Sequence, residues 1–498
     1  MKKLLFSVAT LLILNIAFAQ EPVFNWNTSN TKPNLDIETK TYLNFADGYY
    51  LVNKIAPSAT EFNPTISVEC FNNKNERLYK KIVNFEAMED FAGAVYLNKT
   101  IYIFKSLFSK DAGKNTLTAT PLNAEGMNLG KPVTISSISA EKLVQRGRFN
   151  VASSTDGSKL IVLSQPNFVK DENEKITIAL YNDKLEKQWS SDQTFTYPWT
   201  RAVENEPFVN NNGTAFILKK TDMKGDDNTY SIFSFTGKAL KEFKIQMDGK
   251  KKIATIAKAF ADNGDFTIGG YYTEDSKVKI GFGTAFHGSF LQRIDNGGET
   301  VKIAVINPFE KRKDIVAKSI VFNNNNPIIL GEEYFVTSQS RPRNPNIPIA
   351  DQDMFARDYS YNGLDIIIDG FDAAGKPLYF TSINKSNNSK NDNGVWVSYF
   401  GAIMKGKLYI IFNDEKSNYD EKKKAIIFGG SPKIIVYTTV DPITGVAAAV
   451  LPVSNTGPVG GKSGDMNLHP DVFIKLNDNQ CVIRAESADL YRMGLVNF

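Results

Sequence analysis

The segment between residues 338 and 358 carries the densest group of charged side chains suited to holding a ligand. Its charged members are three arginines and two aspartates: Arg341, Arg343, Asp351, Asp353 and Arg357. Guanidinium groups form paired hydrogen bonds with carboxylates and phosphates, so this segment predicts an anion-binding loop. The alternative is an extended loop whose charges only keep it soluble.

Two tryptophans mark a second kind of candidate contact. Trp396 lies in a Val-Trp-Val-Ser-Tyr-Phe run, and Trp199 is followed closely by Arg201. Each lies where one structural unit would join the next. Exposed rings at such links can stack on sugars, whereas buried rings would fill the space between units.

The inventory of catalytic side chains is poor. The only histidines are His287 and His469, which leaves little room for a histidine-based triad or metal site. Carboxylates at 332, 333, 351 and 353 could act as a pair on a glycoside, but the sequence does not fix their separation. We therefore expect a non-catalytic binding or scaffold protein without metal or cofactor. An exported carbohydrate-active hydrolase or lyase on the same fold is the alternative.

A turn that recurs eight times indicates the strands that must position these residues. Each turn is short, polar and rich in glycine or asparagine, and each precedes a β-prone run. The turns are 47–48, 98–99, 156–157, 212–213, 263–264, 323–326, 405–406 and 477–479. This pattern is a strong local signal for β-hairpins.

A second series of turns interleaves with the first, so each unit contains two hairpins and four strands. It comprises 72–75, 123–126, 182–183, 236–237, 296–298, 372–375 and 441–442. Four short antiparallel strands make one blade of a β-propeller, and eight units predict about eight blades. The last unit has room for only three strands, so seven blades is the alternative. Residues 20–37 could supply the missing strand and close the ring by pairing the two termini.

Strand parity predicts where the long connections lie. In a four-stranded blade, the first and third turns emerge at one end and the remaining connections at the other. The long connections are 331–362, 384–394, 413–432 and 453–470, mostly in blades 6 to 8. Binding residues favour long loops on rigid scaffolds, so we expect these loops to form a face that binds a protein or glycan partner.

Charge gives no support for a nucleic-acid partner. The 498-residue chain has 58 basic and 54 acidic residues, a formal net charge of +4, and its basic residues are spread along the sequence. The tight basic runs 250–252 and 422–424 fit solvated turns.

The N-terminus has the pattern of an export signal. Lys2 and Lys3 precede an apolar stretch over 4–16, and Ala-Phe-Ala at 17–19 fits a cleavage site. We expect residues 1–19 to be a signal peptide and 20–498 a single propeller domain. We expect the exported protein to be in the periplasm, at the outer-membrane periphery or outside the cell, with its partner at the cell envelope. The mature chain has no second stretch long enough for a membrane helix.

Cys70 and Cys481 are the only cysteines. They fall in the first and last units, which are neighbours in a closed ring, so one disulfide is possible. The alternative is two buried free thiols, since each cysteine lies inside an apolar strand.

The cleavage site gives a direct prediction. N-terminal mass analysis of the exported protein should show a chain that begins at Gln20, because signal peptidase cuts after the small residue of such a site. An intact Met1 in exported protein would contradict it.

Overall fold

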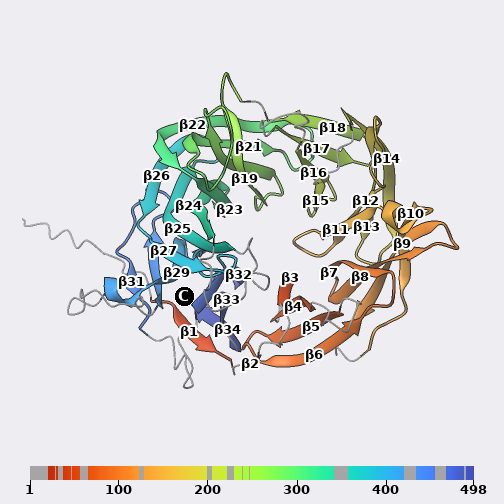
Figure 1. Cartoon of the computed structure of the whole chain (residues 1–498), viewed down its shortest axis with the longest axis horizontal. Helices are drawn as coiled ribbons and strands as arrows, with labels where there is room; N and C mark the ends of the chain where they lie inside the picture. Colours follow the sequence, from red (N-terminus) through yellow and green to blue (C-terminus); the bar gives the residue numbers. More distant parts are fainter. Residues whose placement is uncertain are drawn as a thin grey trace, which may run out of the picture.

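Eight antiparallel sheets are arranged in a ring (Figure 1). The computed structural model describes residues 21–27, 30–31, 37–45, 48–55, 65–122, 128–198, 205–220, 229–237, 239–245, 247–340, 357–419, 433–454, 467–486 and 490–498. The fold is an eight-bladed β-propeller, as the turn pattern predicts. Within the described residues no helix is long and apolar enough to cross a membrane.

The first four blades are regular four-stranded meanders. Blade 1 has β3 (Ile37–Phe45), β4 (Gly48–Ile55), β5 (Thr65–Asn72) and β6 (Arg77–Asn84). Blade 2 has β7 (Glu89–Leu97), β8 (Thr100–Ser109), β9 (Lys114–Leu122) and β10 (Val133–Ser139). Blade 3 has β11 (Arg148–Ser153), β12 (Lys159–Gln165), β13 (Asn173–Asn182) and β14 (Lys187–Pro198). Blade 4 has β15 (Asn205–Val209), β16 (Ala215–Lys220), β17 (Tyr230–Thr236) and β18 (Ala239–Lys244).

The other four blades vary in strand length. Blade 5 has β19 (Lys252–Phe260), β20 (Phe266–Thr273), β21 (Ala285–Ile294) and β22 (Val301–Lys313). Blade 6 has β23 (Ile315–Asn323), β24 (Asn326–Ser340), β25 (Arg357–Phe371) and β26 (Pro377–Ile383), with β27 (Asn387–Lys390) added beside β25. Blade 7 has β28 (Tyr399–Met404), β29 (Lys407–Glu415), β30 (Lys433–Val440) and β31 (Leu451–Pro452). Blade 8 has β32 (Asn467–Asn477), β33 (Gln480–Glu486) and β34 (Leu490–Asn497).

The N-terminus completes blade 8, which confirms the predicted closure of the ring. Strand β1 (Val23–Trp26) pairs antiparallel with β34, with Val23 opposite Asn497 and Trp26 opposite Gly494. A short strand β2 (Asn30–Thr31) also pairs with β34. Gly494 is required here, because a Cβ at this position would lie 2.6 Å from the Trp26 ring.

The two predicted turn series match the strand order. Every turn of the first series lies between the first and second strands of a blade, and every turn of the second series lies between the third and fourth. Residues 46–47 and 123–127 of these turns lie outside the described residues. The Asn98–Lys99 turn shows the local cause: both residues have positive φ, which is the backbone of the two-residue turns that suit twisted hairpins. We call the end of the disc with these turns the turn face and the opposite end the loop face.

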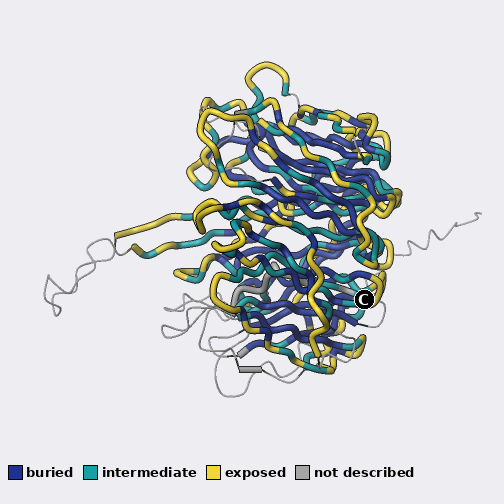
Figure 2. The backbone as a smooth tube through the Cα atoms, turned by 90° about the vertical axis from the view of Figure 1, so that its right-hand side faces the viewer, coloured by how far each residue is buried: buried dark blue, intermediate teal, exposed yellow. Residues whose placement is uncertain are grey.

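Two predicted long loops are instead partly strands. The 331–362 connection contains the outer halves of β24 and β25, which stay paired as far as Ser340 and Arg357 and project beyond the disc (Figure 2). The 384–394 connection contains β27, whose residues pair with 360–363. Neighbouring backbone groups bond these polar residues into the sheet, and composition alone gives no sign of that.

The core lies between blades. The second strands contain continuous apolar, buried runs, as in Leu408 to Phe412 of β29. Each hydrophobic cluster draws on two adjacent blades, and one joins blades 7 and 8 to Phe24 of β1. This confirms that the continuously apolar runs are sandwiched between neighbouring blades.

The side chains of buried asparagines bond to the backbone of a neighbouring blade and so join the two blades. Asn413 of blade 7 donates from Nδ2 to the carbonyl of Leu468 in blade 8 at 2.7 Å, and it accepts the Leu468 N–H at 2.8 Å. Asn75 donates to the carbonyl of Met493 at 2.8 Å and so joins blade 1 to blade 8. Each of these bonds fixes the position of one blade against the next.

The two thiols are free and buried, so the structure has the free-thiol arrangement and no disulfide. Cys70 packs in the cluster between blades 1 and 2, whereas Cys481 packs between blades 7 and 8. Adjacent blades therefore do not bring the two sulfurs together, and burial raises the pKa of both thiols.

A carboxylate is buried between blades 5 and 6. Asp369 on β25 accepts hydrogen bonds from the Ser289 hydroxyl and from Asn307 Nδ2, the latter at 3.2 Å. Complete burial raises the pKa of Asp369 to about 7, although both hydrogen bonds favour the ionised form.

Ring closure gives a stability prediction. Deleting 20–36 from the mature chain should lower the melting temperature of the whole disc, because β34 keeps only β33 as a neighbour and the core loses Phe24. Val23→Ala is the matched control, since this side chain is 39% exposed on the same strand and its truncation should change stability by less than about 0.5 kcal/mol. An unchanged melting temperature after the deletion would contradict the structural role of β1.

Asp369 gives a pH-dependence prediction. Burial raises its folded pKa from the ordinary aspartate value to about 7, so the folded state holds this proton more tightly than the unfolded state. The stability this provides is lost as pH rises from about 4 to 7. Asp369→Asn cannot ionise. As pH rises through this window, the unfolding free energy of the variant should therefore increase relative to that of the parent, by up to about 1.4 kcal/mol per pH unit. Denaturant titrations between pH 4 and 8 would measure it, with exposed Asp111→Asn as the control. Parallel curves for parent and Asp369→Asn would contradict the raised pKa.

Candidate binding site at the loop face of blades 5 and 6

One carboxylate organises the loop between β20 and β21. Asp314, the single residue between β22 and β23, is buried and accepts the backbone N–H groups of Gly281, Gly283 and Thr284 at 2.9, 2.8 and 3.1 Å. Both glycines have φ near +85°, a conformation that other residues adopt only with strain. The Asp314 carboxylate therefore fixes the backbone of this loop.

The fixed loop presents an aromatic side chain to solvent. Phe282, between the two glycines, is 82% exposed, and the neighbouring Ile280 is also exposed. Gly281 lies against Phe335 and Val336 of the projecting β24–β25 hairpin, where a Cβ would be 3.5 Å from the Val336 nitrogen. Phe282 is thus held beside the hairpin.

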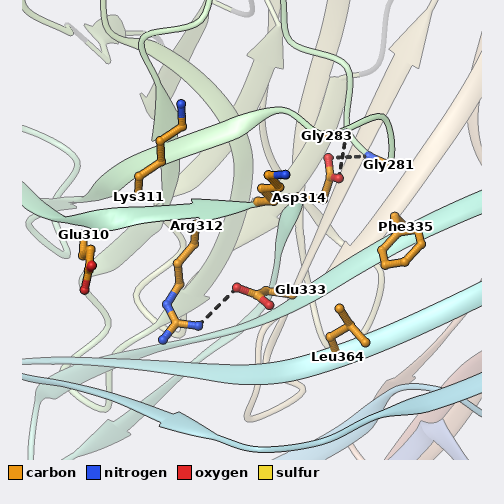
Figure 3. Close-up of a pocket in the computed structure, with 10 residues that line it drawn as sticks. Gly281, Gly283, Glu310, Lys311, Arg312, Asp314, Glu333, Phe335 and Leu364 are labelled. Carbon is orange, nitrogen blue, oxygen red and sulfur yellow. Dashed lines mark hydrogen bonds and ion pairs between the residues drawn. The ribbon is translucent and has the colours of Figure 1, made fainter.

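A cavity of about 630 Å³ opens beside this loop, at the junction of blades 5 and 6. Figure 3 shows that β22, β24 and β25 supply most of its wall. Phe335 and Leu364 form an apolar side, and the remaining lining is charged or backbone. This volume is in the range of sites that hold a small molecule or a few side chains of a partner.

One residue of the cavity wall is an arginine, Arg312, which interacts with two acidic side chains. Arg312 donates to Glu333 Oε1 at 3.2 Å (Figure 3). It also lies 3.6 Å from Asp365 Oδ2. Burial raises the pKa of Glu333; Arg312 opposes the shift, and Asp365 and Asp314 add to it. The guanidinium is already engaged, so it shapes the cavity more than it attracts an anion.

The free positive charge of the cavity comes from two lysines. Lys311 and Lys313 are exposed on β22 and form no ion pair with any residue that the structure describes. Glu310 lies beside them. The cavity therefore offers charges of both signs next to an apolar wall, which suits the mixed surface of a protein better than a simple anion.

Most of the sequence-predicted site falls outside the described residues. This applies to Arg341, Arg343, Asp351, Asp353, Trp199 and Arg201. Arg357 is described: it is exposed, lies at the end of β25 and pairs with Ser340. It belongs to the projecting hairpin beside the cavity.

Trp396 packs against a neighbouring blade. Its ring is half-buried and meets His469 edge-on at a centroid distance of 5.8 Å. Its carbonyl accepts hydrogen bonds from Asn387 and Asn413, each at 3.0 Å. This arrangement fits the space-filling alternative for a tryptophan between units.

The candidate carboxylates at 332 and 333 face different surroundings. Glu332 is completely buried, pairs with buried Lys385 at 2.7 Å and accepts the Ser398 hydroxyl at 2.9 Å. Glu333 faces the cavity and Arg312. A glycoside in the cavity would therefore meet Glu333 and not Glu332.

The central residues of this site were missed by sequence reasoning. The signal was present in the Gly-Phe-Gly run at 281–283, where two glycines flank an aromatic between two strands. The role of Asp314 depends on the hydrogen bonds it makes across the blade, which only the fold reveals.

No protein-family model and no curated protein matches the chain. Similar solved structures include the WD40 domain of SCAP from fission yeast, with 8% identity over 95% of this chain and 98% of that chain and a TM-score of 0.41. The β-propeller domain of the Trilobed protease from Pyrococcus furiosus has 9% identity over 87% and 100%, with a TM-score of 0.38. A protein of unknown function from Bacteroides caccae has 12% identity over 68% and 94%, with a TM-score of 0.28. These similarities concern the fold.

Proposed function

We propose that this β-propeller is an exported, non-catalytic binding protein that holds a partner protein of the cell envelope at the loop face of blades 5 and 6. The observation that carries the proposal is Phe282, an aromatic ring that is 82% exposed on a loop fixed by Asp314. An exposed ring is in contact with water in the free protein, and a partner that buries it gains apolar contact. Because the loop is already ordered, binding costs less conformational entropy.

The cavity beside Phe282 supports a macromolecular partner. Aromatic side chains dominate binding energy in protein interfaces, where they sit next to pockets and are surrounded by a polar rim. Here Phe282 lies next to a cavity with Phe335 and Leu364 on one side and Lys311 and Glu310 on another. A partner protein can match both the apolar wall and the charges of both signs.

Export rests on the sequence of the first 19 residues. Their basic, apolar and small-residue segments are ordered as in a secretory signal. An exported protein meets its partner at the cell envelope, so the proposed partner belongs there.

A partner-capture experiment tests the proposal. Immobilised mature chain should retain a partner from a cell-envelope extract, and Phe282→Ala should lower the measured affinity at least about tenfold, as for a residue central to an interface. Ile443→Ala is the matched control, because Ile443 is 63% exposed on the turn face. Its truncation should leave binding unchanged.

Two outcomes would contradict the proposal. Equal affinity of Phe282→Ala and the parent would remove the loop face of blades 5 and 6 from the interface. Capture that survives complete proteolysis of the extract would indicate a glycan partner instead of a protein.

A further inference from the structure

Three buried polar side chains meet at the boundary between blades 3 and 4. They are Glu174 on β13, Asn205 on β15 and Lys219 on β16, and each is at most 3% exposed. Asn205 and Lys219 are directly opposite each other in the pairing of β15 with β16. This cluster lies away from the cavity between blades 5 and 6.

The carboxylate of Glu174 bridges the other two groups. Its Oε2 accepts a hydrogen bond from Lys219 Nζ, and its Oε1 accepts one from Asn205 Nδ2 at 2.5 Å. Lys219 Nζ is also 3.5 Å from Asn205 Oδ1. The amine, the side-chain amide and an acid that contacts both nitrogens are therefore assembled before any reaction.

The surroundings favour an uncharged amine. The Phe195 ring lies beneath Lys219 Nζ at 5.1 Å and is itself buried in the core between the two blades. Burial lowers the pKa of Lys219, while Glu174 opposes this shift. A desolvated lysine that can give its proton to an adjacent carboxylate is a competent nucleophile.

We propose that Lys219 and Asn205 form an intramolecular amide cross-link, with Glu174 as the proton carrier. Lys219 Nζ gives a proton to Glu174 and attacks Asn205 Cγ, forming the Nζ–Cγ bond. The Cγ–Nδ2 bond then breaks. The two protons lost by the Lys219 ammonium leave with Nδ2 as ammonium, and Glu174 returns to a carboxylate. No oxidant, reductant or second substrate takes part.

Blade 6 contains a buried pair that lacks the third component. Lys385 and Glu332 are both completely buried and 2.7 Å apart. Among the described residues, their other hydrogen-bond partners are the Val397 carbonyl and the Ser398 hydroxyl, and neither is a side-chain amide. Lys385 therefore serves as an internal control that should stay unmodified.

Peptide mapping of the folded, full-length mature chain tests the cross-link. Trypsin should release residues 202–220 lighter by one ammonia and uncut after Lys219, because that side chain is acylated, whereas cleavage after Lys385 should proceed normally. A linear 202–219 peptide of unchanged mass, recovered from folded protein, would overturn the proposal without any variant.

A competing loss of ammonia within the same peptide must be separated. Asn212 and Gly213 can form a cyclic imide of identical mass. The cross-link closes a ring over 205–219 and suppresses fragment ions from inside it. The imide leaves those ions intact and takes up water at mildly alkaline pH. Ammonia loss confined to Asn212 would overturn the proposal.

Two variants test the assigned roles. Lys219→Arg keeps a cation beside Glu174 but should abolish the ammonia loss. Glu174→Gln should slow the cross-link at least about a hundredfold, as expected when a positioned acid–base group is removed. Unchanged cross-linking in Glu174→Gln would remove Glu174 from the reaction, and ammonia loss retained in Lys219→Arg would overturn the cross-link itself.

Discussion

The packing of each blade against its neighbours is the constraint on which the rest of this molecule depends. A four-stranded sheet whose second strand is apolar on both faces cannot be stable in water alone, and only two flanking sheets can cover it. Leu408 to Phe412 illustrate this, since they are buried by blades on both sides. Closing the ring is the arrangement that gives every blade two neighbours.

Polar groups between blades then fix the geometry that apolar packing leaves free. Hydrophobic contact has little directional preference, whereas the paired hydrogen bonds of Asn413 to the Leu468 backbone allow only one register. Asp314 performs the same task at the loop face, where it holds a surface loop by three of its amides. The rigid scaffold thus extends to the exposed Phe282.

The fold could be predicted from the sequence because its signals are local. Turn residues such as Asn98 and Gly157 specify the backbone of their own hairpins, and their spacing predicts four strands per blade and about eight blades. The site could be predicted only in part, since it depends on contacts between residues far apart in the chain. Nothing near Asp314 shows that it binds the Gly281 amide, and nothing near Trp396 shows that His469 lies against its ring.

The pairing of β1 with β34 also sets the order in which the molecule can assemble. Asn75 in blade 1 and Met493 in blade 8 are 418 positions apart, yet they share a hydrogen bond. Contacts over such long stretches of chain form slowly, because the ends of a long loop rarely meet. Blade 8 cannot form until β34 has been synthesised, so a chain that emerges N-terminus first must keep β1 unpaired until then. Throughout that time the blade at each end of the incomplete ring has one uncovered face. A chaperone or a protease would bind the incomplete chain at these two faces.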